Sequence, residues 1–338
     1  LDVGEGKSLS PAAHCVAPTP LSSGLKRRPQ RPLLVCEKIC YTTTMKLTLM
    51  GTGTSHGVPV IGCDCKVCTS RDPRDNRYRC SAYLTHGDTK LVVDVGPEFR
   101  LQALRTGIKK LDAVLLTHSH ADHLHGLDDL RIFSHTQPCR FDAQAFPETA
   151  GMGLPIYANA QTLLDIRHRF AYLFVTHDEG GGVAKLDFKD CGTEPFGLGS
   201  IQIVPVPLMH GHTHTTGWLF SCGEGTEKHS IAYLTDCSAV PEPSYALIAA
   251  HAGTLDHLVI DGLRVKPHST HFHFDQALAC AEKIGARHTW LTHLNHDLLH
   301  TEIQNYIDKK LADFPQLEKM VRDGGSVSPA YDQLTLTV

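Results

Sequence analysis

The sequence has no hydrophobic run long enough to span a bilayer, and it has no excess of positive charge. Its 338 residues include 32 Lys and Arg against 36 Asp and Glu, which gives a formal net charge of -4. A transmembrane helix needs about 20 consecutive apolar residues. Positive charge is what attracts polymeric nucleic acids and acidic membranes. We therefore expect no membrane partner and no nucleic acid polymer as a partner.

The sequence contains 12 cysteines but lacks the pattern of spacings that is typical of a disulfide framework. Three of them lie within residues 63–68, and the others are scattered. This pattern is typical of a reducing compartment, so we expect a cytoplasmic protein. Hydrophobic residues make up 41% and charged residues 20%, the composition of a globular protein with a sizeable core. Histidine is the exception, with 23 residues, several in tight groups.

Residues 1–44 differ from the rest of the chain. They contain Pro, Ser and the basic group Lys26-Arg27-Arg28, without a sustained period of two or 3.6 residues. The apolar piece at 33–36 is too short for the core of a signal peptide. We interpret 1–44 as a disordered extension, or as a stretch upstream of the true start, and place one domain at 45–338.

The strongest functional signal is residues 117–123, Thr-His-Ser-His-Ala-Asp-His, directly after the apolar run 111–116. A buried strand therefore leads into three histidines and an aspartate, which suit zinc, manganese or iron. The first two histidines alternate and can face one ion, while the aspartate and the third histidine can serve a neighbouring ion. A histidine-rich surface loop without metal is the alternative. The four side chains are His118, His120, Asp122 and His123.

Four further predicted strands end at or near a histidine or an aspartate. Strand ends can meet at one edge of a β scaffold, so we expect these residues to join residues 117–123 in one site. His210 has close rivals in His212 and His214. The strands with their candidate residues are 201–208 with His210, 230–234 with Asp236, 257–260 with Asp261, and 289–291 with His293, followed by His296.

Periodicity and caps predict the other elements. We expect Asp94 either to orient a ligand histidine or to be an ordinary turn residue. Long loops are expected at 134–155 and 176–194, and both are candidate substrate lids. The predicted strands are 46–50, 81–85, 90–95, 156–158 and 334–338, and the predicted helices are 97–108, 124–133, 159–174, 274–285 and 301–314.

The cysteines of the C-x-C-x-x-C motif, Cys63, Cys65 and Cys68, can surround a single zinc ion. A fourth ligand must come from elsewhere, and Cys80 or a distant histidine could supply it. Three free thiols and a redox motif are the alternatives. A closed zinc site of this kind would be structural, because it would hold a loop that has no core of its own.

These motifs together resemble a known family. The H-x-H-x-D-H pattern at 118–123 is similar to the signature of the metallo-β-lactamase fold. More narrowly, residues 51–68 and the segment Thr-His-Leu-Asn-His at 292–296 resemble the PhnP-like branch, which includes phosphoribosyl 1,2-cyclic phosphate phosphodiesterase. The resemblance runs from Met45 to the C-terminus. It implies an α/β fold in four layers, an αβ/βα sandwich of two mixed β-sheets flanked by helices.

The resemblance also implies residue roles, two divalent ions (Zn or Mn) in the active site, one structural Zn and a homodimer. His271 stands where the family has a histidine proposed as general acid, with His268 and His273 as competitors. The family has Asp where this chain has His273. The implied ligands are His118, His120 and His210 for one metal, Asp122, His123 and His293 for the other, Asp236 as a bridge, and Cys63, Cys65, Cys68 and His296 for the structural zinc.

We therefore expect a dinuclear metal-dependent hydrolase, a phosphodiesterase for small or cyclic phosphodiesters. A metal-bridging hydroxide would attack phosphorus while His271 protonates the leaving alkoxide. Three alternatives remain open: a tRNase Z-like nuclease, a glyoxalase II-like thioesterase and a non-catalytic, metal-stabilised binding module. The net charge of -4 disfavours the first. The cysteine cluster disfavours the second, and a complete set of ligands for an open dinuclear site disfavours the third.

Overall fold

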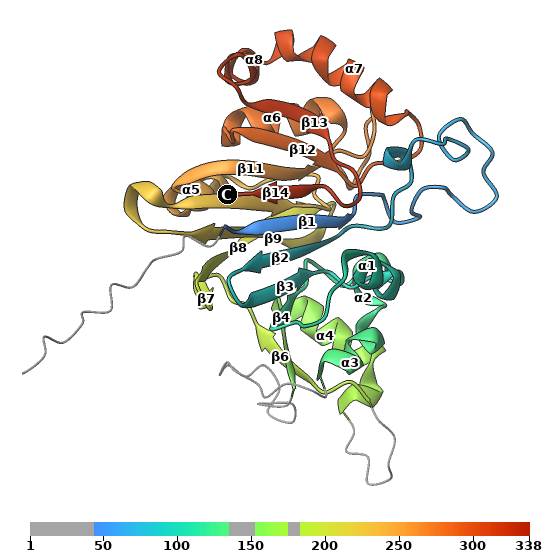
Figure 1. Cartoon of the computed structure of the whole chain (residues 1–338), viewed down its shortest axis with the longest axis vertical. Coiled ribbons are helices and arrows are strands. Elements are labelled where there is room, and N and C mark those ends of the chain that lie inside the picture. The colour runs from blue at the N-terminus through green and yellow to red at the C-terminus, as the bar shows by residue number, and fades with distance from the viewer. Residues whose placement is uncertain (1–43, 135–152, 175–182) are drawn as a thin grey trace, which may run out of the picture. The chain divides into compact units, whose positions relative to one another are not determined.

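The computed structural model describes residues 44–134, 153–174 and 183–338, so the expected N-terminal extension and most of the loop expected at 134–155 lie outside the described residues. Two seven-stranded sheets build the described part (Figure 1). The first sheet has the order β14-β1-β2-β3-β4-β5-β6. Its strands are β1 (Lys46–Gly51), β2 (Ser81–His86), β3 (Thr89–Val93), β4 (Ala113–Leu115), β5 (Leu154–Ala158), β6 (Leu186–Asp190) and β14 (Thr335–Thr337).

The second sheet has the order β13-β12-β11-β10-β9-β8-β7. Both sheets are mixed: β3 to β6 and β10 to β13 run parallel, and the remaining neighbours are antiparallel. The strands of the second sheet are β7 (Phe196–Leu198), β8 (Ile201–His210), β9 (Thr213–Cys222), β10 (His229–Leu234), β11 (Thr254–Asp261), β12 (His288–Thr292) and β13 (Ser326–Pro329).

Helices cover the outer face of each sheet. The helices α1 to α4 pack on the first sheet and α5 to α8 on the second, and Figure 1 shows α6, α7 and α8 beside β12 and β13. The first group is α1 (Phe99–Thr106), α2 (Ala121–Leu124), α3 (Arg131–Ser134) and α4 (Ala160–Arg169), and the second is α5 (Glu242–His251), α6 (Phe274–Ile284), α7 (His300–Lys310) and α8 (Pro315–Arg322).

Three hydrophobic layers separate these four layers of secondary structure. The alternation of strand side chains explains this arrangement, as β3 illustrates. Leu91 and Val93 pack between the two sheets with Trp218 and Tyr233 of the second sheet, whereas Val92 faces the helices of the first sheet. The αβ/βα sandwich expected from the sequence is therefore confirmed. No helix in the described residues is long and apolar enough to cross a membrane.

Some elements were predicted wrongly from the sequence, and others were not predicted. The loop expected at 176–194 contains β6, which Asp187 and Lys189 concealed because they are charged yet buried, with Lys189 Nζ 2.8 Å from Asp187 Oδ2. The helix expected at 124–133 is broken into α2, a 3-10 turn and α3. The sequence patterns also gave no prediction of β7, β9, β13, α5 and α8.

Candidate active site

The loop after β4 carries the histidine motif and changes direction within it. His118 lies in the loop, and His120 is the N-cap of the one-turn helix α2. Asp122 and His123 lie in the first turn of this helix. The change from extended chain to helix separates His118 and His120 from Asp122 and His123, as we expected from the sequence.

The first group is His118, His120 and His210, whose ligand atoms all lie within 4.8 Å of one another. His210 is the last residue of β8, so it comes from the opposite sheet to the histidine motif. Its rivals His212 and His214 are exposed and belong to none of the clusters found among the described residues.

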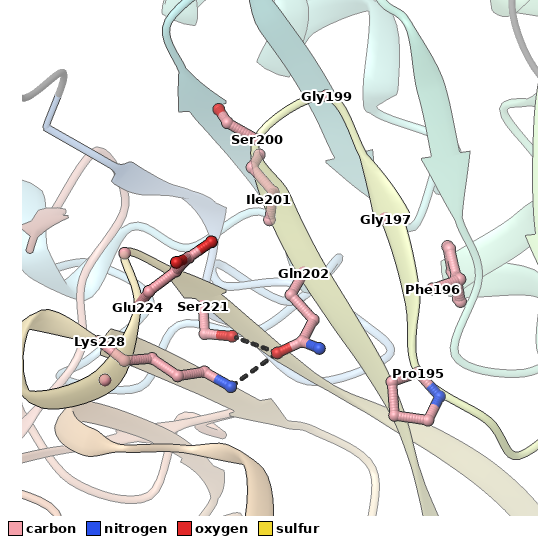
Figure 2. Close-up of a pocket in the computed structure, with 12 residues that line it drawn as sticks. Pro195, Phe196, Gly197, Gly199, Ser200, Ile201, Gln202, Ser221, Glu224 and Lys228 are labelled. Carbon is pink, nitrogen blue, oxygen red and sulfur yellow. Dashed lines mark hydrogen bonds between the residues drawn. The ribbon is translucent and has the colours of Figure 1, made fainter. Parts of the chain in front are cut away.

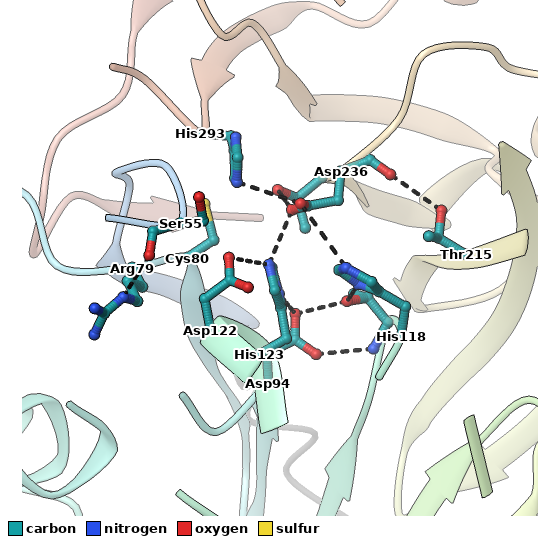
Figure 3. A network of polar contacts seen from close by, with 12 residues as sticks. Ser55, Arg79, Cys80, Asp94, His118, Asp122, His123, Thr215, Asp236 and His293 are labelled. Carbon is teal, nitrogen blue, oxygen red and sulfur yellow. Dashed lines mark hydrogen bonds and ion pairs between the residues drawn. The ribbon is translucent and has the colours of Figure 1, made fainter. Parts of the chain in front are cut away.

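The second group is Asp122, His123, Asp236 and His293, again within 4.8 Å. Asp236 occupies the centre, as Figure 3 shows. Its Oδ2 lies 3.2 Å from His123 Nε2, and its Oδ1 lies 3.2 Å from His293 Nε2 and 4.0 Å from His118 Nε2. Asp236 therefore contacts members of both groups.

Unusual backbone conformation aims two of these side chains. Asp236 and His293 have φ of 53° and 60°, in the left-handed region that few non-glycine residues adopt. Asp236 follows the end of β10 and His293 follows the end of β12, and the left-handed conformation turns each residue out of its sheet. Asp94, which follows β3, has the same feature, with a φ of 59°. Such strain concentrates at functional sites.

Asp94 orients the histidine motif, the first of the two roles considered for it. Its Oδ2 accepts hydrogen bonds from His123 Nδ1 at 2.7 Å and Thr117 Oγ1 at 2.8 Å. Its Oδ1 accepts from the Thr117 backbone N at 2.8 Å. Because Thr117 Oγ1 donates to Asp94, it accepts from His118 Nδ1, 3.0 Å away. The buried carboxylate of Asp94 thus fixes the ring of His123 directly and the ring of His118 through Thr117.

The remaining nitrogens of these rings fit a metal. The Nε2 atoms of His118, His123 and His293 are buried and have no hydrogen-bond partner within the described residues. Nδ1 of His118 donates to Thr117 Oγ1, and Nδ1 of His210 donates to Thr270 O, 2.6 Å away, so Nε2 of each of these neutral rings keeps its lone pair. Burial would lower the pKa of His123, but Asp236, Asp122 and Asp94 raise it well above the ordinary value, so this ring must release a proton when Nε2 binds a metal. Buried lone pairs and carboxylates that face one another are unfavourable unless a cation lies between them. This donor set suits divalent cations.

Protonation also favours metal binding. Burial lowers the pKa of His210 to about 4 and that of His293 to about 3, so both rings are neutral at pH 7. Burial alone would raise the pKa of Asp236, but the charge of His123 outweighs it and holds the pKa well below the usual range. Neutral imidazole and ionised carboxylate are the forms that bind metals.

His271 lies beside both groups. Its ring centroid is 4.5 Å from that of His210 and 4.4 Å from that of His293, against which it stacks. Its Nδ1 is 2.7 Å from Oδ2 of Asp261, which the sequence indicated as a candidate ligand at a strand end and which here contacts His271. Burial would lower the pKa of His271, but the hydrogen bond and charge of Asp261 raise it above the ordinary value.

The two competitors of His271 occupy different places. His273 is the N-cap of α6 and belongs to none of the clusters found in the described part of the chain. His268 is exposed, with its ring centroid 5.2 Å from that of His271.

The cysteine motif meets a histidine from the other end of the chain. His296 Nδ1 lies 3.4 Å from Cys63 Sγ, 3.5 Å from Cys65 Sγ and 3.3 Å from Cys68 Sγ. A hydrogen bond from the backbone of Cys68 contributes most to lowering the pKa of Cys65, to about 6. These four side chains fit a tetrahedral zinc site. Cys80 lies apart from them, near Gly53 O and Thr292 Oγ1.

A polar pocket at the far end of β8 offers no comparable chemistry. It has a volume of about 540 Å³, and Gln202 lies at its centre (Figure 2). The Oε1 atom of Gln202 accepts hydrogen bonds from Lys228 Nζ at 2.6 Å and Ser221 Oγ at 3.4 Å. The side chains of Gln202, Lys228 and Ser221 thus satisfy one another.

Comparison with known proteins identifies the family. Residues 89–294 match the family described as the beta-lactamase superfamily domain. The structure also superposes on a crystal structure described as a new diphosphatase from the PhnP family, with 37% sequence identity and a TM-score of 0.67. The alignment covers 87% of this chain and 97% of that chain. The chain belongs to the metallo-β-lactamase superfamily and is PhnP-like. These matches support a hydrolase.

Two other relatives are more distant or longer. A Zn(2+)-bound PqqB from Methylobacterium extorquens shares 18% identity over 87% of this chain and all of that chain, with a TM-score of 0.62, which shows the fold alone. An octanoyltransferase from Porphyromonas gingivalis is 35% identical over 265 residues, covering 76% of this chain and 48% of the relative. The chain therefore spans about half the length of that protein.

Proposed function

We propose that this PhnP-like protein is a dinuclear metal-dependent phosphodiesterase that hydrolyses small phosphodiesters. The observation that carries the proposal is the position of Asp236 between two groups of potential ligands, in which the buried Nε2 atoms of His118, His123 and His293 have no hydrogen-bond partner among the described residues. The sequence predicted all seven members of these groups. Their metal-binding roles, and the choice of zinc or manganese, are part of the proposal.

Each group would hold one divalent ion, and Asp236 would contact both. Bound ions would lower the pKa of a water molecule and neutralise charge on a phosphoryl group. The protein's own contribution is to keep the rings fixed: Asp94 holds His123, and Thr270 O holds His210. Cys63, Cys65, Cys68 and His296 would bind a third, structural zinc.

His271 would act as the general acid. In hydrolysis, water oxygen bonds to phosphorus, and the bond from phosphorus to the leaving oxygen breaks with its electron pair on that oxygen. The protonated ring can donate from Nε2 because Nδ1 is engaged with Asp261 at 2.7 Å. The carboxylate stabilises the charged ring before the transfer and fixes its orientation.

A diester of diphosphate is the second candidate substrate, because the similar structure with 37% identity is described as a diphosphatase. Its leaving group is a phosphate ester, a far weaker base than an alkoxide, so it depends less on a general acid. The sequence-based alternatives, a tRNase Z-like nuclease, a thioesterase and a binding module, are less well supported. The match covers only 48% of the octanoyltransferase, so it does not support octanoyl transfer by this chain.

A substrate screen tests the proposal. Metal-loaded protein would be assayed with bis(4-nitrophenyl) phosphate, cyclic ribose phosphates, a diester of diphosphate, a thioester and a tRNA precursor. We expect turnover of at least one small phosphodiester, lost on chelation and restored by zinc or manganese. Turnover of only the thioester or only the tRNA precursor, or of none, would reject it. The cytoplasmic location and the homodimer stay predictions.

A further inference from the structure

The segment between β11 and α6 forms a loop closed at its base beside His271. The backbone N of Leu263 donates to Phe272 O at 2.9 Å, and that of Phe274 donates to Arg264 O at 2.9 Å. The backbone N of Phe272 also donates to Cys237 O at 2.8 Å, which ties the loop to the strand end that carries Asp236. The tip of the loop, residues 265–269, is exposed. We call residues 264–270 the rim loop.

Side chains hold the exposed tip of the rim loop in shape. The guanidinium of Arg264 donates to the carbonyl oxygens of Lys266 at 3.2 Å and Pro267 at 3.3 Å. The backbone N of Thr270 lies 3.3 Å from His268 Nδ1. A backbone N–H can only donate, so His268 Nδ1 is an acceptor and its proton is on Nε2. The rim loop thus presents a neutral imidazole with one defined donor.

This donor lies on the outer side of the general acid. The His271 ring faces the metal-binding groups through His210 and His293, at 4.5 and 4.4 Å, and the ring of His268 is 5.2 Å away in the exposed rim loop. A leaving group departs next to the residue that protonates it. Whatever the substrate carries beyond its leaving oxygen is therefore close to His268.

We propose that the rim loop is a subsite for a phosphoryl group on the leaving side of the scissile bond, and that His268 Nε2–H donates to one of its oxygens. The subsite rests on the proposed function, since it takes His271 as the mark of the leaving side. His268 is a substrate-binding residue and takes no part in the proton transfer. The subsite favours substrates in which a second phosphate follows the scissile bond over simple aryl esters.

Two conservative variants separate binding from a purely structural role. The amide of His268→Gln can place an N–H near the position of Nε2, whereas His268→Asn keeps an acceptor near the position of Nδ1 and loses the distal donor. His268→Ala loses both, and Ser269→Ala is the control in the same loop. The first measurement is the affinity of each metal-loaded variant for inorganic diphosphate and inorganic phosphate by calorimetry, with its metal content. The second is KM for bis(4-nitrophenyl) phosphate and for P1,P2-bis(4-nitrophenyl) diphosphate.

We expect the wild type and Ser269→Ala to bind diphosphate more tightly than phosphate. His268→Ala and His268→Asn should reduce that preference about tenfold and raise KM more for the diphosphate diester than for the aryl diester. His268→Gln should keep most of the preference. A full preference for diphosphate in His268→Asn with a loss in His268→Gln would show that His268 only fastens the loop. An equal preference in all five proteins would also overturn the subsite. If the wild type hydrolyses neither ester nor a cyclic ribose phosphate, the proposed function fails, while diphosphate binding still decides the subsite.

Discussion

His271 Nδ1 lies 2.7 Å from Asp261 Oδ2, and both side chains are buried next to the proposed metal ligands. The pair connects the end of β11 with the residue that directly follows the rim loop, so the fold places a carboxylate behind the ring that faces the site. The carboxylate and the ring form the part of the site that acts on the leaving group.

Removal of His271 should therefore affect substrates according to their leaving group. His271→Ala is expected to lower kcat by about 10²-fold or more for a diester with an alkyl leaving group, and far less for one with a 4-nitrophenolate leaving group. Steady-state kinetics on the two esters, with the metal content measured, checks this. Equal losses on both would remove the general-acid role.

Asp94 should control metal affinity without binding metal itself. Asp94→Ala removes the acceptor of His123 Nδ1 and of Thr117, so His123 loses its fixed orientation. We expect about a 10- to 100-fold weaker affinity for the active-site metals. Competition with a chromophoric chelator measures it. An unchanged affinity would mean that the ring is held by its other contacts.

The cysteine cluster should account for one zinc ion and part of the stability. Cys65→Ser is expected to remove one equivalent of zinc and to lower the melting temperature, because the loop around residues 63–68 then loses its cross-link to His296. Cys222→Ser, a cysteine outside the cluster, is the control. Zinc analysis and thermal unfolding check both. A Cys65→Ser protein with full zinc would contradict the structural site.

Asp332, a buried residue that is not among the proposed metal ligands, should make the stability of the protein depend on pH. Burial raises the pKa of Asp332 to about 6, against the opposing effects of Tyr78 N and Thr52 Oγ1, which donate to it at 2.8 Å each. The folded state therefore binds a proton that the unfolded state has lost between about pH 4 and 6, so this contribution to stability falls as pH rises through that window.

Asp332→Asn removes this titration. Relative to the wild type, it should gain roughly 2 kcal/mol of unfolding free energy between pH 4 and pH 7. Denaturant unfolding of both proteins at the two pH values measures the difference. A constant difference between the two pH values would show that Asp332 titrates normally in the folded protein.

Local patterns predicted most of the site because each ligand follows the end of an apolar run. His210 is the last residue of β8, and His293 directly follows β12. Asp236 lies two residues after the end of β10, and the histidine motif follows β4. Such a boundary is visible in a single sequence. The pairing of Cys63, Cys65 and Cys68 with His296 came only from the family resemblance, since nothing local to the cysteines indicates a partner more than 200 residues away.

The parts that could not be predicted depend on contacts between distant segments. Asp261 and Asp94 were visible as residues after strands, but their partners, His271 and His123, are fixed only by the packing of the two sheets. Strand β6 was missed because its buried charges, Asp187 and Lys189, interrupt the apolar pattern. Helix α5 has apolar residues on most of its surface, so it shows little of the 3.6-residue period that marks a helix.

The most direct test is the metal content of the purified, metal-replete protein and its Asp236→Ala variant, measured by mass spectrometry of the elements. We predict about three divalent ions per wild-type chain, two in the active site and one at the cysteines. Asp236→Ala should keep the cysteine-bound zinc and lose most of the other two. A wild type with only the cysteine-bound zinc, or a variant with the wild-type metal content, would contradict the dinuclear site.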